Sequence, residues 1–340
     1  MTSIFERSAL ASVLLAIAPL CVAHHSAAMF DTNSRVVVEG VVTKYEWKNP
    51  HVYLYVESES DNGQTILWEV EGHPPAVLKR MGWSRDSFSV GERVVVTGQA
   101  HRNPERYSIR IKDVRRSDGT GLISAFSESA LDDGVAAQST RTGLSGTWLT
   151  IPDHDATPDL TYSGSASLPL TLKGFAAIEA FSPELDPGKD CIPYTAPIAM
   201  LFPDAKSIEI DEKEIWIRTD FEGVERIVYM DVESHGDAPT KRHGHSIGRW
   251  EGGVLVVDTQ RFSDHATGNT FSLPSGQQKH LVERFELNTD GMSLTYHYEL
   301  EDPEYLAAPI TGEARWDHRP DLELSPEECD LENARRFLLE

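Results

Sequence analysis

Pairs of short apolar segments joined by glycine-containing turns run through the second half of the chain. The three clearest pairs are residues 215–217 with 227–229, 247–250 with 254–257, and 282–287 with 294–300. The turns contain Glu222-Gly223, Gly252-Gly253 and Asp290-Gly291, and glycine adopts the positive φ angles that tight hairpins need. Successive hairpins protect their edge strands by closing into a barrel or stacking as a sandwich. Residues 144–340 are therefore expected to form an antiparallel barrel or sandwich.

The first half has five strand-like segments with one helical segment among them. The expected strands are residues 36–47, 52–56, 65–70, 93–97 and 107–114. The expected helix, residues 74–81, has Pro74 and Pro75 near its start and Gly82 after its end. Three strands, a helix and two strands is the order of a five-stranded OB-type barrel. A small α+β sandwich is the alternative, and either way the chain is mainly β.

Residues 1–23 have the three-part pattern of a secretory signal peptide. Arg7 supplies the positive region, residues 10–20 are mostly apolar, and Cys21-Val22-Ala23 places small residues before a cleavage site. The alternative is a buried N-terminal helix. No later segment approaches the 18 or so apolar residues of a membrane-spanning helix. We expect cleavage near Ala23 and a periplasmic or secreted mature protein.

The charge is unevenly distributed along the chain. Residues 24–116 carry 13 Lys and Arg against 12 Asp and Glu, whereas residues 117–340 carry 17 against 41. An acidic C-terminal half argues against nucleic acid and anionic membrane surfaces as partners. Residues 117–143 are small and polar, with Phe126 as the one aromatic residue. This segment is expected to be a flexible linker between domains 24–116 and 144–340.

Cysteine usage suggests one disulfide. Cys21 leaves with the signal peptide, so the mature chain retains Cys191 and Cys329. An even number of cysteines in an oxidising compartment favours pairing, and two free thiols are the alternative. A Cys191–Cys329 bond would tie the end of the chain to the region after residues 173–181, the expected short helix of the second domain.

Several motifs of the first half resemble an uncharacterised family of exported proteobacterial proteins, domain of unknown function 6152. They include His24-His25-Ser26, Trp47-Lys48-Asn49-Pro50-His51, Trp68-Glu69-Val70-Glu71-Gly72 and Gly91-Glu92. The resemblance covers residues 24–116 and implies export, without an activity. The second half, with Gly244-His245-Ser246-Ile247-Gly248-Arg249-Trp250, is similar to another uncharacterised envelope domain. Gln260-Arg261 departs from that domain's pattern, which has small residues at these positions. Gly146-Thr147-Trp148 resembles the start of lipocalin-like barrels.

The mature N-terminus is the first candidate metal site. Cleavage after Ala23 would expose the α-amine and imidazole of His24, which together chelate metals such as Cu(II), and His25 adds a second imidazole. His51 and His101 lie in the expected loops beside the OB binding face. The alternative is that these four histidines are unrelated surface residues.

A second candidate metal site lies in the second domain. On a strand, His243 and His245 would share one face, as a pair of metal ligands requires. Asp258, His265, His280 and Glu283 are candidate partners from neighbouring hairpins. A hydrolytic zinc site needs three such ligands and an open position for water. The alternative is an ordinary polar rim, in which His280 and Glu283 form a simple pair.

The sequence lacks the motifs of several enzyme classes. It contains no glycine-rich phosphate loop, H-E-x-x-H or C-x-x-C pattern. We therefore favour a periplasmic binding or accessory protein for a small molecule, with copper or zinc as possible metals. A metal-dependent hydrolase using the second domain is the alternative function.

Overall fold

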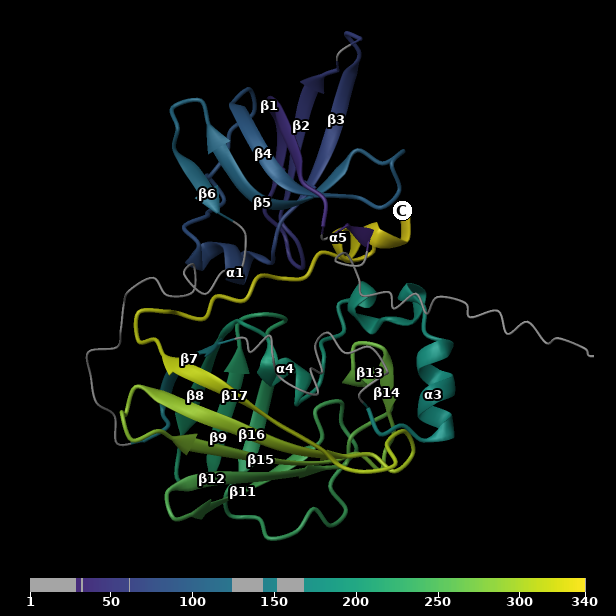
Figure 1. Cartoon of the computed structure of the whole chain (residues 1–340). Helices are drawn as coiled ribbons and strands as arrows, with labels where there is room; N and C mark the ends of the chain where they lie inside the picture. The colour runs from purple at the N-terminus through teal and green to yellow at the C-terminus, as the bar shows by residue number, and fades with distance from the viewer. Residues whose placement is uncertain (1–28, 32, 61, 124–142, 152–167, 340) are drawn as a thin grey trace, which may run out of the picture.

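The computed structural model describes residues 29–31, 33–60, 62–123, 143–151 and 168–339. Two β-barrels are stacked one above the other, and the last residues of the chain run between them (Figure 1). The predicted signal peptide with His24 and His25, and residues 124–142 of the predicted linker, lie outside the described residues. No helix of the described part is long and apolar enough to cross a membrane.

The first barrel has the predicted OB-type order. Its elements are β1 (Val36–Glu46), β2 (Tyr53–Glu59), β3 (Thr65–Glu71), α1 (Pro75–Arg80), β4 (Arg93–Ala100) and β5 (Ser108–Arg116). β1 pairs with both β2 and β4, and a parallel pairing of β3 with β5 closes the barrel. A short strand, β6 (Gly121–Ile123), pairs antiparallel with β5 and lies within the first residues of the predicted linker.

Two glycines allow the strands of this barrel to approach closely. A Cβ atom on Gly40 of β1 would lie 2.3 Å from the carbonyl oxygen of Glu57 in β2. One on Gly98 of β4 would lie 2.3 Å from the carbonyl oxygen of Arg110, where the register of β4 and β5 shifts. Only glycine avoids these clashes, so both positions constrain how the sheet can curve.

The second barrel closes with nine strands. They are β7 (Gly146–Ile151), β8 (Ala205–Ile210), β9 (Glu214–Thr219), β10 (Glu225–Tyr229), β11 (His245–Glu251), β12 (Val254–Gln260), β15 (His280–Leu287), β16 (Ser293–Glu301) and β17 (Ile310–His318). All neighbours pair antiparallel except β10 and β11, which are parallel. The prediction of a barrel or a sandwich is thus resolved in favour of the barrel.

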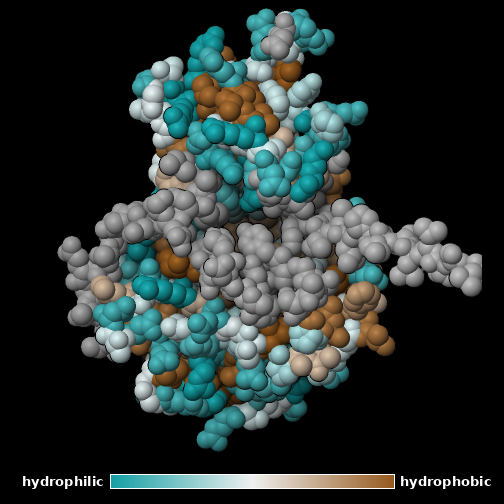
Figure 2. Space-filling view, viewed as in Figure 1, coloured by the Kyte–Doolittle hydropathy of each residue, from teal (hydrophilic) through white to brown (hydrophobic). Residues whose placement is uncertain are grey.

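Short elements lie outside the nine strands. They are α3 (Leu172–Glu179), α4 (Ile198–Leu201), the hairpin of β13 (His265–Thr270) and β14 (Leu273–Ser275), and α5 (Leu331–Ala334). α3 corresponds to the predicted helix at 173–181 and exposes Leu172 and Phe175. Figure 2 shows a largely hydrophilic visible surface on which apolar side chains gather in patches.

Large side chains fill the interior of the second barrel. Trp148, Phe285, Tyr296 and Trp316 are each fully buried, and the rings of Tyr296 and Trp316 stack with centroids 5.5 Å apart. Lipocalins of similar construction hold a ligand inside the barrel. Here the aromatic core occupies that position, so a ligand site is expected on the outer surface of the barrel.

The disulfide prediction is confirmed. Cys191 and Cys329 are bonded, with Cα atoms 5.8 Å apart. Cys191 follows a 3₁₀ turn, Pro187–Asp190, of the second barrel domain, and Cys329 lies in the segment that leaves β17. That segment passes between the barrels and ends against the first one (Figure 1).

Candidate functional site

The parallel pairing of β10 with β11 creates the candidate site. Parallel neighbours cannot be joined by a tight turn, so the chain must cross over between their opposite ends. Residues 230–244 make this crossover, along the outside of the barrel beside β11 and β12. The crossover brings His235 to the outer face of β12.

Polar side chains form a row on that outer face. His245 of β11 lies directly opposite Gln260 of β12, and His280 of β15 lies directly opposite Glu301 of β16. Thr259 and Leu281, one residue further along, pair β12 with β15. Side chains alternate between the two faces of a strand, and Ser246 and Thr259, next to this row, are buried on the inner side. Asp258, two residues before Gln260, shares the outer face with the row.

Asp258 is the centre of a chain of hydrogen bonds. Its Oδ1 atom accepts from Nε2 of His235 at 2.9 Å and from Nε2 of His280 at 3.2 Å. The Nδ1 atom of His235 lies 2.9 Å from Nδ1 of His245, whose ring stacks on Tyr229. Nδ1 of His280 lies 3.3 Å from a carboxylate oxygen of Glu301. Four strands and the crossover are thereby connected.

The surroundings of Asp258, His280 and His245 shift the pKa values of these three groups in different directions. Hydrogen bonds from His280 and then His235 lower the pKa of Asp258 to about 2, so this carboxyl is ionised at neutral pH. The same contact with Asp258 raises the pKa of His280. Burial and the neighbouring His235 lower the pKa of His245. His280 therefore takes up a proton more readily than His245 does.

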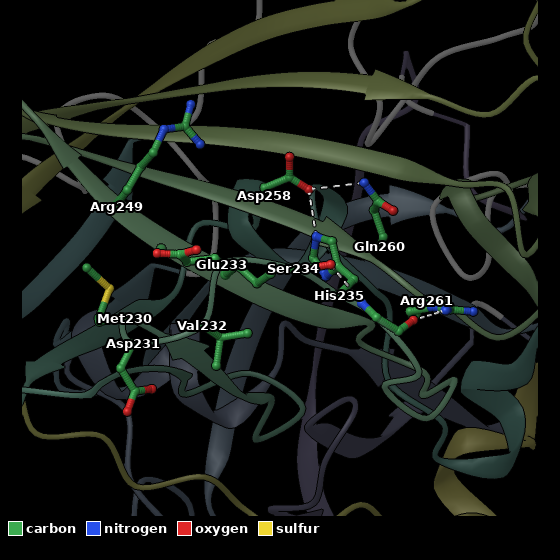
Figure 3. Close-up of a pocket in the computed structure, with 13 residues that line it drawn as sticks. Met230, Asp231, Val232, Glu233, Ser234, His235, Arg249, Asp258, Gln260 and Arg261 are labelled. Carbon is green, nitrogen blue, oxygen red and sulfur yellow. Dashed lines mark hydrogen bonds and ion pairs between the residues drawn. The ribbon is translucent and has the colours of Figure 1, made fainter.

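Beside His235 and Asp258, this series of hydrogen-bonded side chains borders a groove of about 770 Å³ (Figure 3). The crossover supplies one wall and the outer faces of β11 and β12 supply the other. Carboxylates and nitrogen-bearing side chains both line it: Asp231, Glu233 and Asp258, with Arg249, Arg261 and His235. Arg261 donates to the carbonyl oxygen of Gly236, which helps to hold the crossover in place.

A buried ion pair supports the groove from inside the barrel. Arg226 of β10 and Glu283 of β15 are almost fully buried and joined by two hydrogen bonds. The hydroxyl of Tyr296 donates to Glu283 at 2.9 Å, and Arg226 reaches Thr259 at 3.3 Å. These contacts link β10, β12, β15 and β16 directly beneath the outer polar row.

The predicted residues of the second domain separate into two groups. His245, Asp258 and His280 do converge, whereas His243, His265 and Glu283 do not join them. Gly244 has a φ of +72° and β11 begins at His245, so the expectation that His243 and His245 share one strand face is wrong. Glu283 faces the interior, so it does not pair with His280, which lies on the outer face of β15.

His235 is the member of the site that sequence reasoning missed. It lies in the crossover, between Ser234 and Gly236, where an isolated histidine carries no strand or helix pattern. His235 belongs to the site because β10 and β11 pair in parallel. The crossover that this pairing requires brings His235 within hydrogen-bonding distance of Asp258, 23 positions later.

The first candidate metal site is only partly described. His51 Nδ1 lies 3.0 Å from the carbonyl oxygen of Gly72, and His101 Nδ1 accepts from the backbone of Asn103. Within the described residues, no three His, Cys, Asp or Glu side chains form a group that could hold a metal ion. A metal site involving His24 and His25 remains a prediction.

Neither a curated protein nor a solved structure matches the chain. The likeness of the second half to another envelope domain therefore remains a prediction. The resemblance of the first half is borne out: residues 11–110, which run from before β1 into β5, match a family of unknown function, DUF6152.

Proposed function

We propose that this chain is an exported binding protein that holds a small polar molecule in the groove beside His235 and Asp258. The observation that carries the proposal is the convergence of His235, Asp258 and His280, from three separate segments, at the edge of a groove of about 770 Å³. A concave site with a few converging polar groups is the usual form of a small-molecule site.

The lining of the groove indicates the class of ligand. Arg249 and Arg261 offer donors to acidic or carbonyl groups, whereas Asp231, Glu233 and Asp258 accept from amines and hydroxyls. Both kinds of side chain occur within one groove, which favours a molecule that carries donors and acceptors. The filled aromatic interior argues against a purely apolar ligand within the barrel.

Export is part of the same proposal. Residues 1–23 have the signal-peptide pattern, and the Cys191–Cys329 disulfide suits an oxidising compartment. Mass spectrometry of the protein from a periplasmic fraction tests this part. A mature chain that begins at His24 supports export, and an intact Met1 in the cytoplasmic fraction refutes it.

Equilibrium dialysis tests the binding site. The purified mature chain is dialysed against a small-molecule extract of the source cells, and retained compounds are identified by mass spectrometry. The wild-type chain is expected to enrich at least one polar compound, and His235→Ala and Asp258→Asn to lose that enrichment. His297→Ala is the matched control, because His297 is an exposed histidine on β16 whose partner is Glu313. Equal enrichment by all four chains would refute the site.

Hydrolysis is the second candidate function. Asp258 holds His235 in one orientation, as an acid–base histidine requires, and the hydrogen bond to Asp258 raises the pKa of a second histidine, His280. If hydrolysis is correct, the retained compound should be converted during dialysis, and Asp258→Asn should abolish its conversion. A compound recovered unchanged by the wild-type chain favours binding alone.

A further inference from the structure

The C-terminal segment occupies the face of the first barrel on which OB-type domains bind their ligands. That face consists of β2 and β3 with the loop between β1 and β2. Asp330 donates from its backbone to the carbonyl oxygen of Asn49 at 2.9 Å. Asn333 is paired twice with the backbone of His51: its side chain accepts from His51 N at 3.3 Å and donates to His51 O at 2.8 Å. The segment therefore binds this loop as a peptide ligand would.

Four side chains of residues 327–336 face the first barrel, and they recur every third residue. Glu327 contacts Trp47, Lys79 and Arg85. Asp330 pairs with Lys48 at 3.0 Å. Asn333 and Arg336 follow at the same spacing. Asp330 caps the start of α5, Asn333 lies within it and Arg336 begins the 3₁₀ helix Arg336–Leu339. Residues three apart in a helix lie on nearly the same side.

Arg336 fits into a cage of aromatic rings and carboxylates. Its guanidinium carbon lies 4.1 Å from the ring centroid of Tyr53 and 5.7 Å from that of Tyr55. One of its nitrogens is 3.0 Å from Glu46, and another is 3.9 Å from Glu69. Stacking on aromatic rings combined with carboxylate contacts is how proteins recognise a guanidinium group in particular.

The disulfide determines whether the segment can leave this cage. Cys329 lies between Glu327 and Asp330, so its bond to Cys191 holds the middle of the segment in place. Reduction by a dithiol would convert Cys191 and Cys329 to thiols as the dithiol becomes a disulfide. The segment would then be tethered only through residues 319–328, which follow β17.

We propose that Tyr53, Tyr55, Glu46 and Glu69 form a binding site for an arginine-bearing protein segment. The chain's own residues 327–336 fill this site while Cys191 and Cys329 are bonded. Reduction of the disulfide weakens the hold of this internal segment, so that an arginine-bearing segment of another protein can compete for the site. The surface is separate from the groove at His235, so the two proposals stand or fall independently.

Fluorescence anisotropy with a labelled peptide tests the site. The peptide comprises residues 325–338 with Cys329→Ser, and the protein is the full mature chain. In a chain with Cys191→Ser, Cys329→Ser and Arg336→Ala, the internal segment is weakened and the peptide should bind. The oxidised wild-type chain should bind it about tenfold more weakly or not at all, since a tethered segment competes at millimolar effective concentration.

Adjacent arginines supply the matched control. Arg336 enters the cage, whereas Arg335 pairs with Asp190 of the second domain. A peptide with Arg336→Ala should lose about tenfold in affinity, and one with Arg335→Ala should bind nearly as well as the parent. Equal affinity of these two peptides, or no binding of the parent to the opened chain, would overturn the proposal.

Hydrogen exchange on the unmodified chain gives a second measurement that needs no variant. Adding a dithiol should increase exchange in residues 325–338 and in residues 47–55 together, because each covers the other. Unchanged exchange in both segments after the disulfide is reduced would also overturn the proposal.

Discussion

At the scale of single residues, the surroundings of His280 and His265 in the second barrel shift their pKa values in opposite directions. His280 lies between Asp258 and Glu301, and the nearby Asp258 carboxylate raises its pKa. His265 is buried near the Lys279 ammonium, and burial, followed by that charge, lowers its pKa to about 4. His265 should therefore make the folded state sensitive to acid.

We expect His265→Asn to reduce the loss of stability in acid. An unfolded histidine binds a proton near pH 6.5, whereas folded His265 does so only near pH 4. Stability is thus retained above pH 6.5 and lost as the pH falls towards 4, by about 3 kcal/mol from this residue. An Asn side chain can still accept from Thr267 N, as His265 Nδ1 does. Urea unfolding at pH 7 and pH 4 measures the difference, and His297→Asn is the exposed control.

The buried ion pair gives a prediction with the largest expected cost at this scale. Glu283→Gln leaves the Arg226 guanidinium buried without a counter-charge, and removing one partner of such a pair typically costs about 3–5 kcal/mol. Chemical unfolding followed by tryptophan fluorescence measures it. Glu286→Gln, on the exposed face of the same strand, should cost little. Similar losses in both variants would contradict the prediction.

At the scale of strands and turns, the sequence predicted what depends on local conformation. Gly223, Gly252 and Gly291 all have positive φ angles, and each lies in a turn that the glycine pattern indicated. The parallel pairing of β10 with β11 was not predictable, because it depends on the closure of the whole barrel. His235 was missed for the same reason. His245, Asp258 and His280 were found because they lie on or beside predicted strands.

Gly98→Ala is expected to destabilise the first barrel. The added Cβ would lie 2.2 Å from a methyl carbon of Ile109 and 2.3 Å from the carbonyl oxygen of Arg110, so β4 and β5 must move apart. Overpacking of this kind typically costs about 1–3 kcal/mol. Thermal unfolding followed by circular dichroism measures the change. Gly143→Ala is the matched control, because a Cβ added there would meet no atom within 4 Å; a loss as large in that variant would show that clash is not the cause.

At the scale of the whole molecule, the C-terminal segment couples two barrels that have separate cores. The cysteine count alone predicted the bond from Cys191 to Cys329. The docking of residues 327–336 on the first barrel was not predictable, because Glu327, Asp330, Asn333 and Arg336 are polar and show no apolar face. Their partners lie about 280 residues earlier in the chain.

The disulfide and the C-terminal segment together should make the two barrels unfold cooperatively. In the oxidised chain the segment is fixed to both barrels, so we expect the two to unfold in one calorimetric transition. Closing a loop of 138 residues stabilises the folded chain by about 5 kcal/mol in the chain-entropy model. Replacing both cysteines, Cys191→Ser with Cys329→Ser, should lower the melting temperature and separate the transitions of the two barrels. Glu328→Ser, an exposed neighbour of Cys329, should leave one transition near the original temperature. A single unshifted transition in the double-cysteine variant would mean that the barrels are coupled by contacts other than the disulfide-held segment.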